Sequence, residues 1–135
     1  MLKWLIPKFA YPDFGLLLLR LGIGASFIIH HGYDKIADPG RWKGLGEQMS
    51  LLGIDFLPEF WGFMAAFAEF FGSIFLALGL FTRPATLLLS ITMLVAVLKH
   101  QTAVEGFAYP LEMLVVFLSL FLIGPGKYSL DKRLR

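Results

Sequence analysis

Arg20 and Glu69 are ionisable residues inside otherwise apolar stretches, so they are the first candidates for chemistry. Arg20 lies 11 residues before His31, and Glu69 lies 11 residues after Pro58. On two antiparallel helices, a rise of 1.5 Å per residue places both charges about 16 Å from the same end. A charge inside a bilayer costs about 2.5–3.5 kcal/mol and usually finds a partner. We therefore predict an Arg20–Glu69 ion pair.

This ion pair has two interpretations. It fixes the register of the two helices without taking part in chemistry, as buried ion pairs can. Alternatively, it anchors a ligand or a proton path, with Arg20 stabilising negative charge and Glu69 holding Arg20 in place. Small residues such as Gly62 and Ser73, on the same side of the second helix as Glu69, allow the close approach that either interpretation requires.

A second polar cluster is expected where the ends of three apolar stretches meet. Its members are His30, His31, Asp34, Lys35, Lys99, His100, Tyr109 and Glu112. Lys99 fits ordinary snorkelling at the interface, whereas Glu112 lies about a turn inside an apolar stretch. The candidate catalytic residues are His31 and Glu112, which could exchange protons. The candidate ligand-binding residues are Arg20, Glu69, His100 and Tyr109.

The histidines raise two alternatives for this cluster. His30 and His31 point about 100° apart on a helix, so only one of them could share a site with His100. Such a site could hold a metal ion together with Glu112, or a haem between two histidines. Neither alternative has a spacing motif behind it, so we predict no metal centre and regard haem as disfavoured. The chain has no cysteine, which excludes thiolate sites.

Four apolar stretches must position these side chains: residues 14–31, 60–81, 84–98 and 107–123. They contain only three of the chain's 12 basic and 10 acidic residues. A soluble amphipathic helix carries charge on its wet face at every turn, and 135 residues cannot bury four helices that are apolar all round. We predict an all-α membrane protein of one domain (residues 1–135), a four-transmembrane-helix bundle with up-down-up-down topology.

A short amphipathic helix is predicted in the longest connection, residues 32–59. Asp38 is a candidate N-cap before Pro39, and the following apolar residues recur at helical spacing from Trp42 to Leu52. The helix would lie at the membrane interface, as a lid over the mouth of the bundle or as a site for a partner. The segment 1–12 also has a composition typical of the interface.

Charge gives the orientation and excludes some partners. Lysine and arginine number seven near the end of the bundle that holds both termini: Lys3, Lys8, Arg83, Lys127, Lys132, Arg133 and Arg135. The opposite end has four: Lys35, Arg41, Lys43 and Lys99. The positive-inside rule therefore predicts that the N- and C-termini are cytoplasmic. A net charge of +2 with 16% charged residues indicates no nucleic-acid partner.

Several short motifs, taken in order, resemble the DoxX family. They are RLG at 20–22 leading to HGYDK at 31–35, Glu69 followed by LGLFTR at 78–83, and GPGKYSLD at 124–131. The resemblance covers about residues 14–131 and implies a four-helix protein of the bacterial inner membrane. It also implies association with redox chemistry, because the family takes its name from the small subunit of a thiosulfate:quinone oxidoreductase. The residues that match the family are Arg20, the 31–35 turn, Glu69 and the segment 124–126 that ends the last helix. The family has no agreed set of catalytic residues that could be assigned to this chain.

Three functions follow as hypotheses. The first is an oxidoreductase subunit that binds a quinone-like molecule or docks a redox partner, since no electron carrier is encoded in the chain. The second is a non-enzymatic scaffold or assembly factor for a membrane complex. The third is a small transporter or proton conduit, which the lack of interrupted helix pairs and repeats disfavours. The partners expected are the lipid bilayer, a redox protein and further copies of the chain.

Overall fold

A computed structural model describes residues 11–101 and 106–135 of the chain. Within these residues the regular structure is helical throughout. The predicted interfacial segment 1–12 lies outside the described residues except for its last two positions. The lysines at positions 3 and 8, which entered the orientation argument, also lie outside them.

Four helical spans form the body of the structure. The first runs from α1 (Pro12–Phe27) through a π turn (Ile28–Gly32) into α2 (Tyr33–Ala37). The second runs from α4 (Pro58–Phe67) through a π turn (Ala68–Gly72) into α5 (Ser73–Leu78). The third and fourth are α6 (Thr82–His100) and α7 (Ala108–Ile123). The first three are long and apolar enough to cross a membrane, and α7 is a shorter apolar helix. The predicted four-helix membrane bundle is confirmed.

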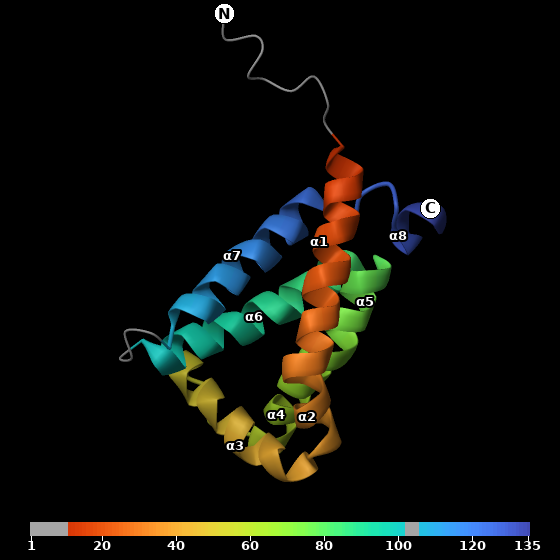
Figure 1. Cartoon of the computed structure of the whole chain (residues 1–135). Helices are drawn as coiled ribbons and strands as arrows, with labels where there is room; N and C mark the ends of the chain where they lie inside the picture. Colours follow the sequence, from red (N-terminus) through yellow and green to blue (C-terminus); the bar gives the residue numbers. More distant parts are fainter. Residues whose placement is uncertain (1–10, 102–105) are drawn as a thin grey trace, which may run out of the picture.

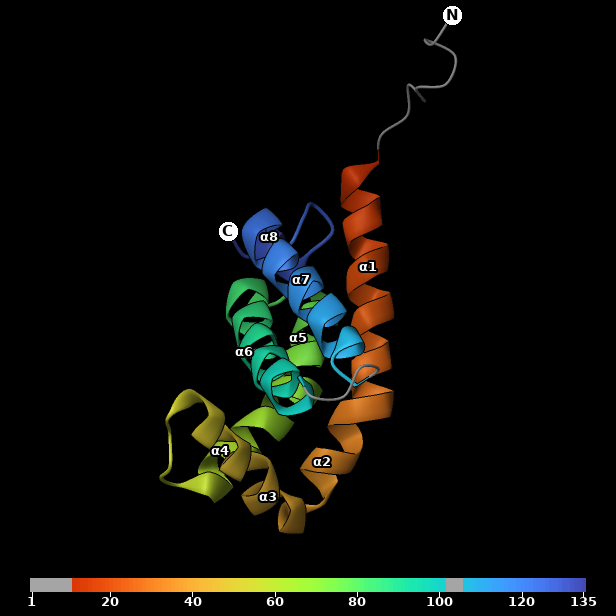
Figure 2. The same ribbon diagram turned by 90° about the vertical axis from the view of Figure 1, so that its left-hand side faces the viewer.

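The spans are arranged as two crossing pairs. The first and second spans lie side by side, and α6 packs along α7 and crosses them obliquely (Figure 1). The start of α1 and the short C-terminal helix α8 (Leu130–Arg133) lie at one end of the molecule, whereas α2, α3 and α4 gather at the other (Figures 1 and 2). The core between the pairs consists of buried residues from all four spans: Phe27, Leu76, Leu89, Met93, Phe117 and Leu120.

The predicted connecting helix is present between the first two spans. A 3-10 turn (Pro39–Arg41) leads into α3 (Trp42–Glu47), and a second 3-10 turn (Gln48–Leu52) follows. The carboxylate of Asp38 accepts a hydrogen bond of 3.1 Å from the Gly40 amide and caps the first turn, as its position before proline predicts. The helix packs directly against α4 (Figure 2).

The register of the first two spans is set by close backbone contacts. A Cβ at position 24 would lie 2.9 Å from the Cβ of Ala77, and one at position 32 would lie 2.6 Å from the carbonyl oxygen of Glu69. Only glycine allows the two backbones to approach this closely. The contact at Gly32 joins the π turns of both spans, which pack against each other. π turns of this kind are frequent at functional sites.

The C-terminal segment is fastened to the turn between α5 and α6. The amide of Asp131 donates to the Gly79 carbonyl at 2.8 Å, and its carboxylate accepts from the amides of Phe81 and Thr82 at 2.8 and 2.9 Å. Burial alone would raise the pKa of Asp131, but these hydrogen bonds outweigh it, so the pKa lies below its ordinary value of 3.8. The ionised carboxylate thus caps the N-terminus of α6.

We expect acid to weaken this attachment. Because the pKa of Asp131 is lowered in the folded state, its contribution to stability is complete above its unfolded pKa, near 4, and is lost as the pH falls through the folded value. The melting temperature in detergent should therefore fall below about pH 4 more steeply for the wild type than for Asp131→Asn, which is already destabilised at pH 7. Asp55→Asn, on an exposed turn, is the control and should leave the wild-type profile unchanged.

Candidate functional site

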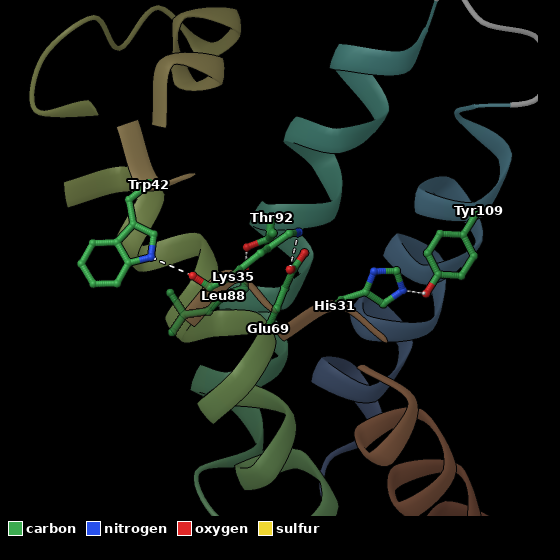
Figure 3. A network of polar contacts seen from close by, with 7 residues as sticks. All are labelled: His31, Lys35, Trp42, Glu69, Leu88, Thr92 and Tyr109. Carbon is green, nitrogen blue, oxygen red and sulfur yellow. Dashed lines mark hydrogen bonds and ion pairs between the residues drawn. The ribbon is translucent and has the colours of Figure 1, made fainter. Parts of the chain in front are cut away.

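Glu69 forms a buried ion pair with Lys35 in the described part of the chain. The Nζ of Lys35 lies 2.5 Å from Oε2 of Glu69 (Figure 3). The Glu69 side chain is 3% exposed and that of Lys35 is 21% exposed, so the carboxylate is enclosed and the ammonium reaches it from the more open side. Glu69 lies in the π turn of the second span, and Lys35 lies in α2.

The predicted Arg20–Glu69 ion pair is therefore wrong. The sequence argument took the first helix to end near His31, but the helix continues through a π turn to Ala37. The contacts of Gly24 and Gly32 show that Glu69 lies opposite the far end of this longer helix. Arg20 lies several turns away, so the two charges are at different depths.

Arg20 instead joins three segments near the other end of the bundle. It is completely buried, and its Nη2 donates a hydrogen bond of 2.7 Å to the carbonyl of Tyr128. Its Nη1 lies 3.5 Å from the carbonyl oxygens of Leu76 and Ala77, the last turn of α5, where a cation also complements the helix dipole. Glycine is required at position 79 for two reasons: its φ of +67° is left-handed, and a Cβ there would overlap the Arg20 guanidinium. Arg20 thus has a structural role in these contacts, and among the described residues no carboxylate forms an ion pair with it.

His31 and Tyr109 are brought together, as the predicted cluster requires. The Oη of Tyr109 lies 2.9 Å from Nε2 of His31, within hydrogen-bond distance, and the two rings stack with centroids 5.5 Å apart (Figure 3). Both rings rest on the buried ring of Phe27, which packs in turn against Phe117. This pair lies one helical turn before Lys35, with His31 partly buried on the first span and Tyr109 exposed on α7.

The other two predicted site residues do not join this pair. Glu112 is exposed on α7, and His100 is the last residue of α6. No side-chain hydrogen bond or ion pair links either of them to another residue in the described ranges 11–101 and 106–135. Within the same ranges no group of three or more histidine or acidic side chains is placed to hold a metal ion. The proton exchange between His31 and Glu112 remains a prediction.

An apolar pocket of about 150 Å³ opens beside the Lys35–Glu69 pair. It lies between α3, the second span and α6, and its walls are mainly leucine, methionine, alanine and valine side chains. Its polar lining residues are Lys35, Gln48, Trp61, Glu69 and Thr92. Thr92 donates to the Leu88 carbonyl at 2.9 Å (Figure 3). Nε1 of Trp61 is buried and has no hydrogen-bond partner among the described residues. A donor of this kind could serve a ligand that accepts hydrogen bonds.

Sequence reasoning missed the partner of Glu69 and the wall of the pocket. One face of the first helix carries Arg20, Gly24, Phe27 and His31. If the helix continues, Lys35 is the next residue on that face, and this periodicity could have predicted that Lys35 faces the second span. Trp42 had been assigned only to an amphipathic helix, yet its Nε1 donates to the Lys35 carbonyl at 2.8 Å and ties α3 to α2 (Figure 3).

The fold and this polar interior define a small, multi-pass, all-helical membrane protein with an intramembrane ion pair. The DoxX family profile matches residues 15–102, about two thirds of the chain, which includes Arg20, the 31–35 turn, Glu69 and the 78–83 turn. The chain therefore belongs to the DoxX family.

A curated relative agrees with this assignment. The chain is 31% identical over 128 residues to the inner membrane protein YqjF of Escherichia coli K12, a match that covers 90% of this chain and 93% of that protein. No solved structure matches the chain. The family, the relative and the apolar spans together place the chain in the inner membrane as an integral, multi-pass protein with the lipid bilayer as its surroundings.

Proposed function

We propose that the protein is a membrane subunit that binds a quinone-like molecule in the pocket beside Lys35 and Glu69 and works with a redox partner. The observation that carries this proposal is the position of the ion pair, at the edge of an otherwise apolar pocket of about 150 Å³ within the spans. That volume suits a single ring rather than a drug-sized molecule, which occupies about 300 Å³ or more.

The pocket offers donors suited to the carbonyl oxygens of a quinone. Lys35 supplies an ammonium that Glu69 holds in place, and Trp61 supplies an indole N–H with no partner among the described residues. In this proposal Lys35 takes the role that the sequence analysis gave to Arg20, the stabilisation of negative charge on the bound ring. The apolar walls would pack against the faces of the ring.

Proton supply is assigned to the His31–Tyr109 pair. His31 lies one turn from Lys35 on the same span, and its hydrogen-bonded partner Tyr109 is 42% exposed, so the pair connects the neighbourhood of the ion pair with the exposed side. Reduction of a quinone to a quinol takes two protons and two electrons. We assign the electrons to a redox protein docked on the subunit.

The orientation proposed for this subunit follows from charge. The end that carries α8 and the α5–α6 turn has the larger number of lysine and arginine residues. We place this end, and both termini, in the cytoplasm. The His31–Tyr109 pair and the entrance formed by α3 then face the opposite side of the membrane.

Filling the pocket should abolish quinone binding. Ala96 lines the pocket on α6, and Ala96→Leu adds three carbon atoms to a space of about 150 Å³. We expect the affinity of the purified protein for a short-chain benzoquinone to fall at least about tenfold, the effect of losing about 1.4 kcal/mol of binding free energy. Quenching of tryptophan fluorescence measures it, because Trp61 lies in the pocket wall.

The matched control adds a similar group on the outside of the bundle. Ala25 is exposed on α1, so Ala25→Leu makes the same substitution on the outer surface and leaves the pocket as it is. This variant should bind the benzoquinone as the wild type does. If Ala96→Leu binds it with wild-type affinity, the quinone does not occupy this pocket and the proposal fails.

A further inference from the structure

A larger cavity lies at the other end of the bundle, beside the attached C-terminal segment. It has a volume of about 800 Å³ and is open to the surroundings. Its walls come from the start of α1, the α5–α6 turn, the end of α7 and the segment around α8. Because all four spans begin or end at this cavity, it lies at the level where the membrane surface meets water.

Cationic side chains dominate the wall of this cavity. Arg83, Lys127, Lys132 and Arg135 line it, and within the described ranges none of them forms an ion pair. The two carboxylates in the wall are committed to backbone groups. Asp13 accepts a 2.8 Å hydrogen bond from the Lys127 amide, and Asp131 accepts those of Phe81 and Thr82. Arg83, Lys127 and Lys132 are therefore available to an anion from outside the chain, whereas Arg135 also interacts with the charge of Asp131.

The same wall carries exposed apolar side chains. Phe81, Ile123 and Leu134 line the cavity with exposed fractions of 59, 62 and 76%. A free phosphate ion would gain nothing from these groups, whereas an amphiphile with a negative head and acyl chains would contact both kinds of surface. Basic pockets between membrane helices on the cytoplasmic side are suited to anionic lipid head groups.

We propose that this cavity binds the head group of an anionic phospholipid, with Arg83, Lys127 and Lys132 as its main phosphate contacts. The site is independent of the quinone pocket, which lies near the opposite end. The bound lipid would hold the C-terminal segment against the α5–α6 turn, because the cations come from both.

Native mass spectrometry of the full chain tests this proposal. The protein, stripped of lipid in a neutral detergent, is incubated with equal amounts of phosphatidylglycerol and phosphatidylcholine. We expect one phosphatidylglycerol to be retained in preference. The amount of phosphatidylglycerol retained should fall at least about tenfold in the triple variant Arg83→Gln/Lys127→Gln/Lys132→Gln. The control removes three cations from the opposite end, Arg41→Gln/Lys43→Gln/Lys99→Gln, and should retain the lipid as the wild type does.

Three outcomes overturn the proposal. Equal retention of the two lipids would show that the site does not discriminate between an anionic and a zwitterionic head group. Equal losses in the two triple variants would show that overall charge, and not this cavity, attracts the lipid. Displacement of phosphatidylglycerol by excess inorganic phosphate would identify a free-phosphate site. Circular dichroism of both triple variants confirms that the helical content is unchanged, so a loss of lipid reflects the cavity.

Discussion

Replacement of Arg20 by alanine is expected to lower the free energy of unfolding by about 2–4 kcal/mol. The guanidinium is completely buried and hydrogen-bonds the Tyr128 carbonyl, with the Leu76 and Ala77 carbonyls close by. Hydrogen bonds to a charged group are worth about 1.5–3 kcal/mol each, and their loss removes the link that the guanidinium makes between the end of α5 and Tyr128. Unfolding in detergent, followed by circular dichroism, measures the change.

The effect should be specific to the attachment of the C-terminal segment. Arg133, an exposed arginine at the same end of the protein, provides the control, and Arg133→Ala should change stability by less than about 0.5 kcal/mol. Proteolysis should also cleave Arg20→Ala earlier near residue 128, because the segment has lost its anchor. Quinone binding should be retained by the folded fraction of Arg20→Ala. If Arg20→Ala keeps its full helical content but loses quinone binding, Arg20 contributes to the ligand site after all.

Removal of the Lys35 charge should be at least as damaging. Lys35→Met keeps the apolar stem but leaves the carboxylate of Glu69, only 3% exposed, without its partner. Breaking a buried ion pair in this way costs about 3–5 kcal/mol. We expect a corresponding drop in the free energy of unfolding at pH 7, measured in the same detergent.

The double variant Lys35→Met/Glu69→Leu separates stability from function. With both charges gone, no carboxylate is left uncompensated, and apolar replacements of buried ion pairs are often neutral or stabilising. Stability should therefore recover most of what Lys35→Met loses, while affinity for the benzoquinone stays low. A double variant that is restored in both properties would show that the pair serves packing alone.

The bundle itself could be predicted because its signal is spread over many residues. Long apolar stretches with three charges define four membrane helices whatever their detailed contacts. The Asp38–Pro39 start of the connecting helix was also predictable, because an N-cap followed by proline is a local signal. The interaction of His31 with Tyr109 followed from placing the ends of the spans at one level.

The partner of Glu69 could not be predicted from the depth argument, because that argument depends on where each helix ends. The connection between the first two spans was taken to begin at Gly32, but the backbone of Gly32 is helical, and its missing side chain allows the contact with Glu69. The role of Arg20 was out of reach for a different reason. Its partners are carbonyl groups, which every residue has and which leave no mark in the sequence.

The pocket and the C-terminal attachment also required the structure. The pocket is formed by three separate elements, and no pattern within any of them indicates the space that they enclose. The attachment depends on hydrogen bonds between residues about 50 positions apart, such as that from Phe81 to Asp131. The motifs at 78–83 and 124–131, which matched the family separately, prove to be two sides of this one contact.

The register of the first two spans is the central claim, and disulfide formation tests it most directly. The chain has no cysteine, so two can be introduced without background. The rings of Tyr33 on the first span and Phe70 on the second lie with their centroids 6.5 Å apart, so cysteines at these two positions should meet. Tyr33→Cys/Phe70→Cys should therefore crosslink on mild oxidation in membranes, as measured by mass spectrometry after alkylation. An Arg20–Glu69 register would instead bring Phe70 opposite Leu19, about 21 Å from Tyr33 along the first span. Efficient crosslinking of Leu19→Cys/Phe70→Cys, with none between positions 33 and 70, would contradict the structure and the Lys35–Glu69 site built on it.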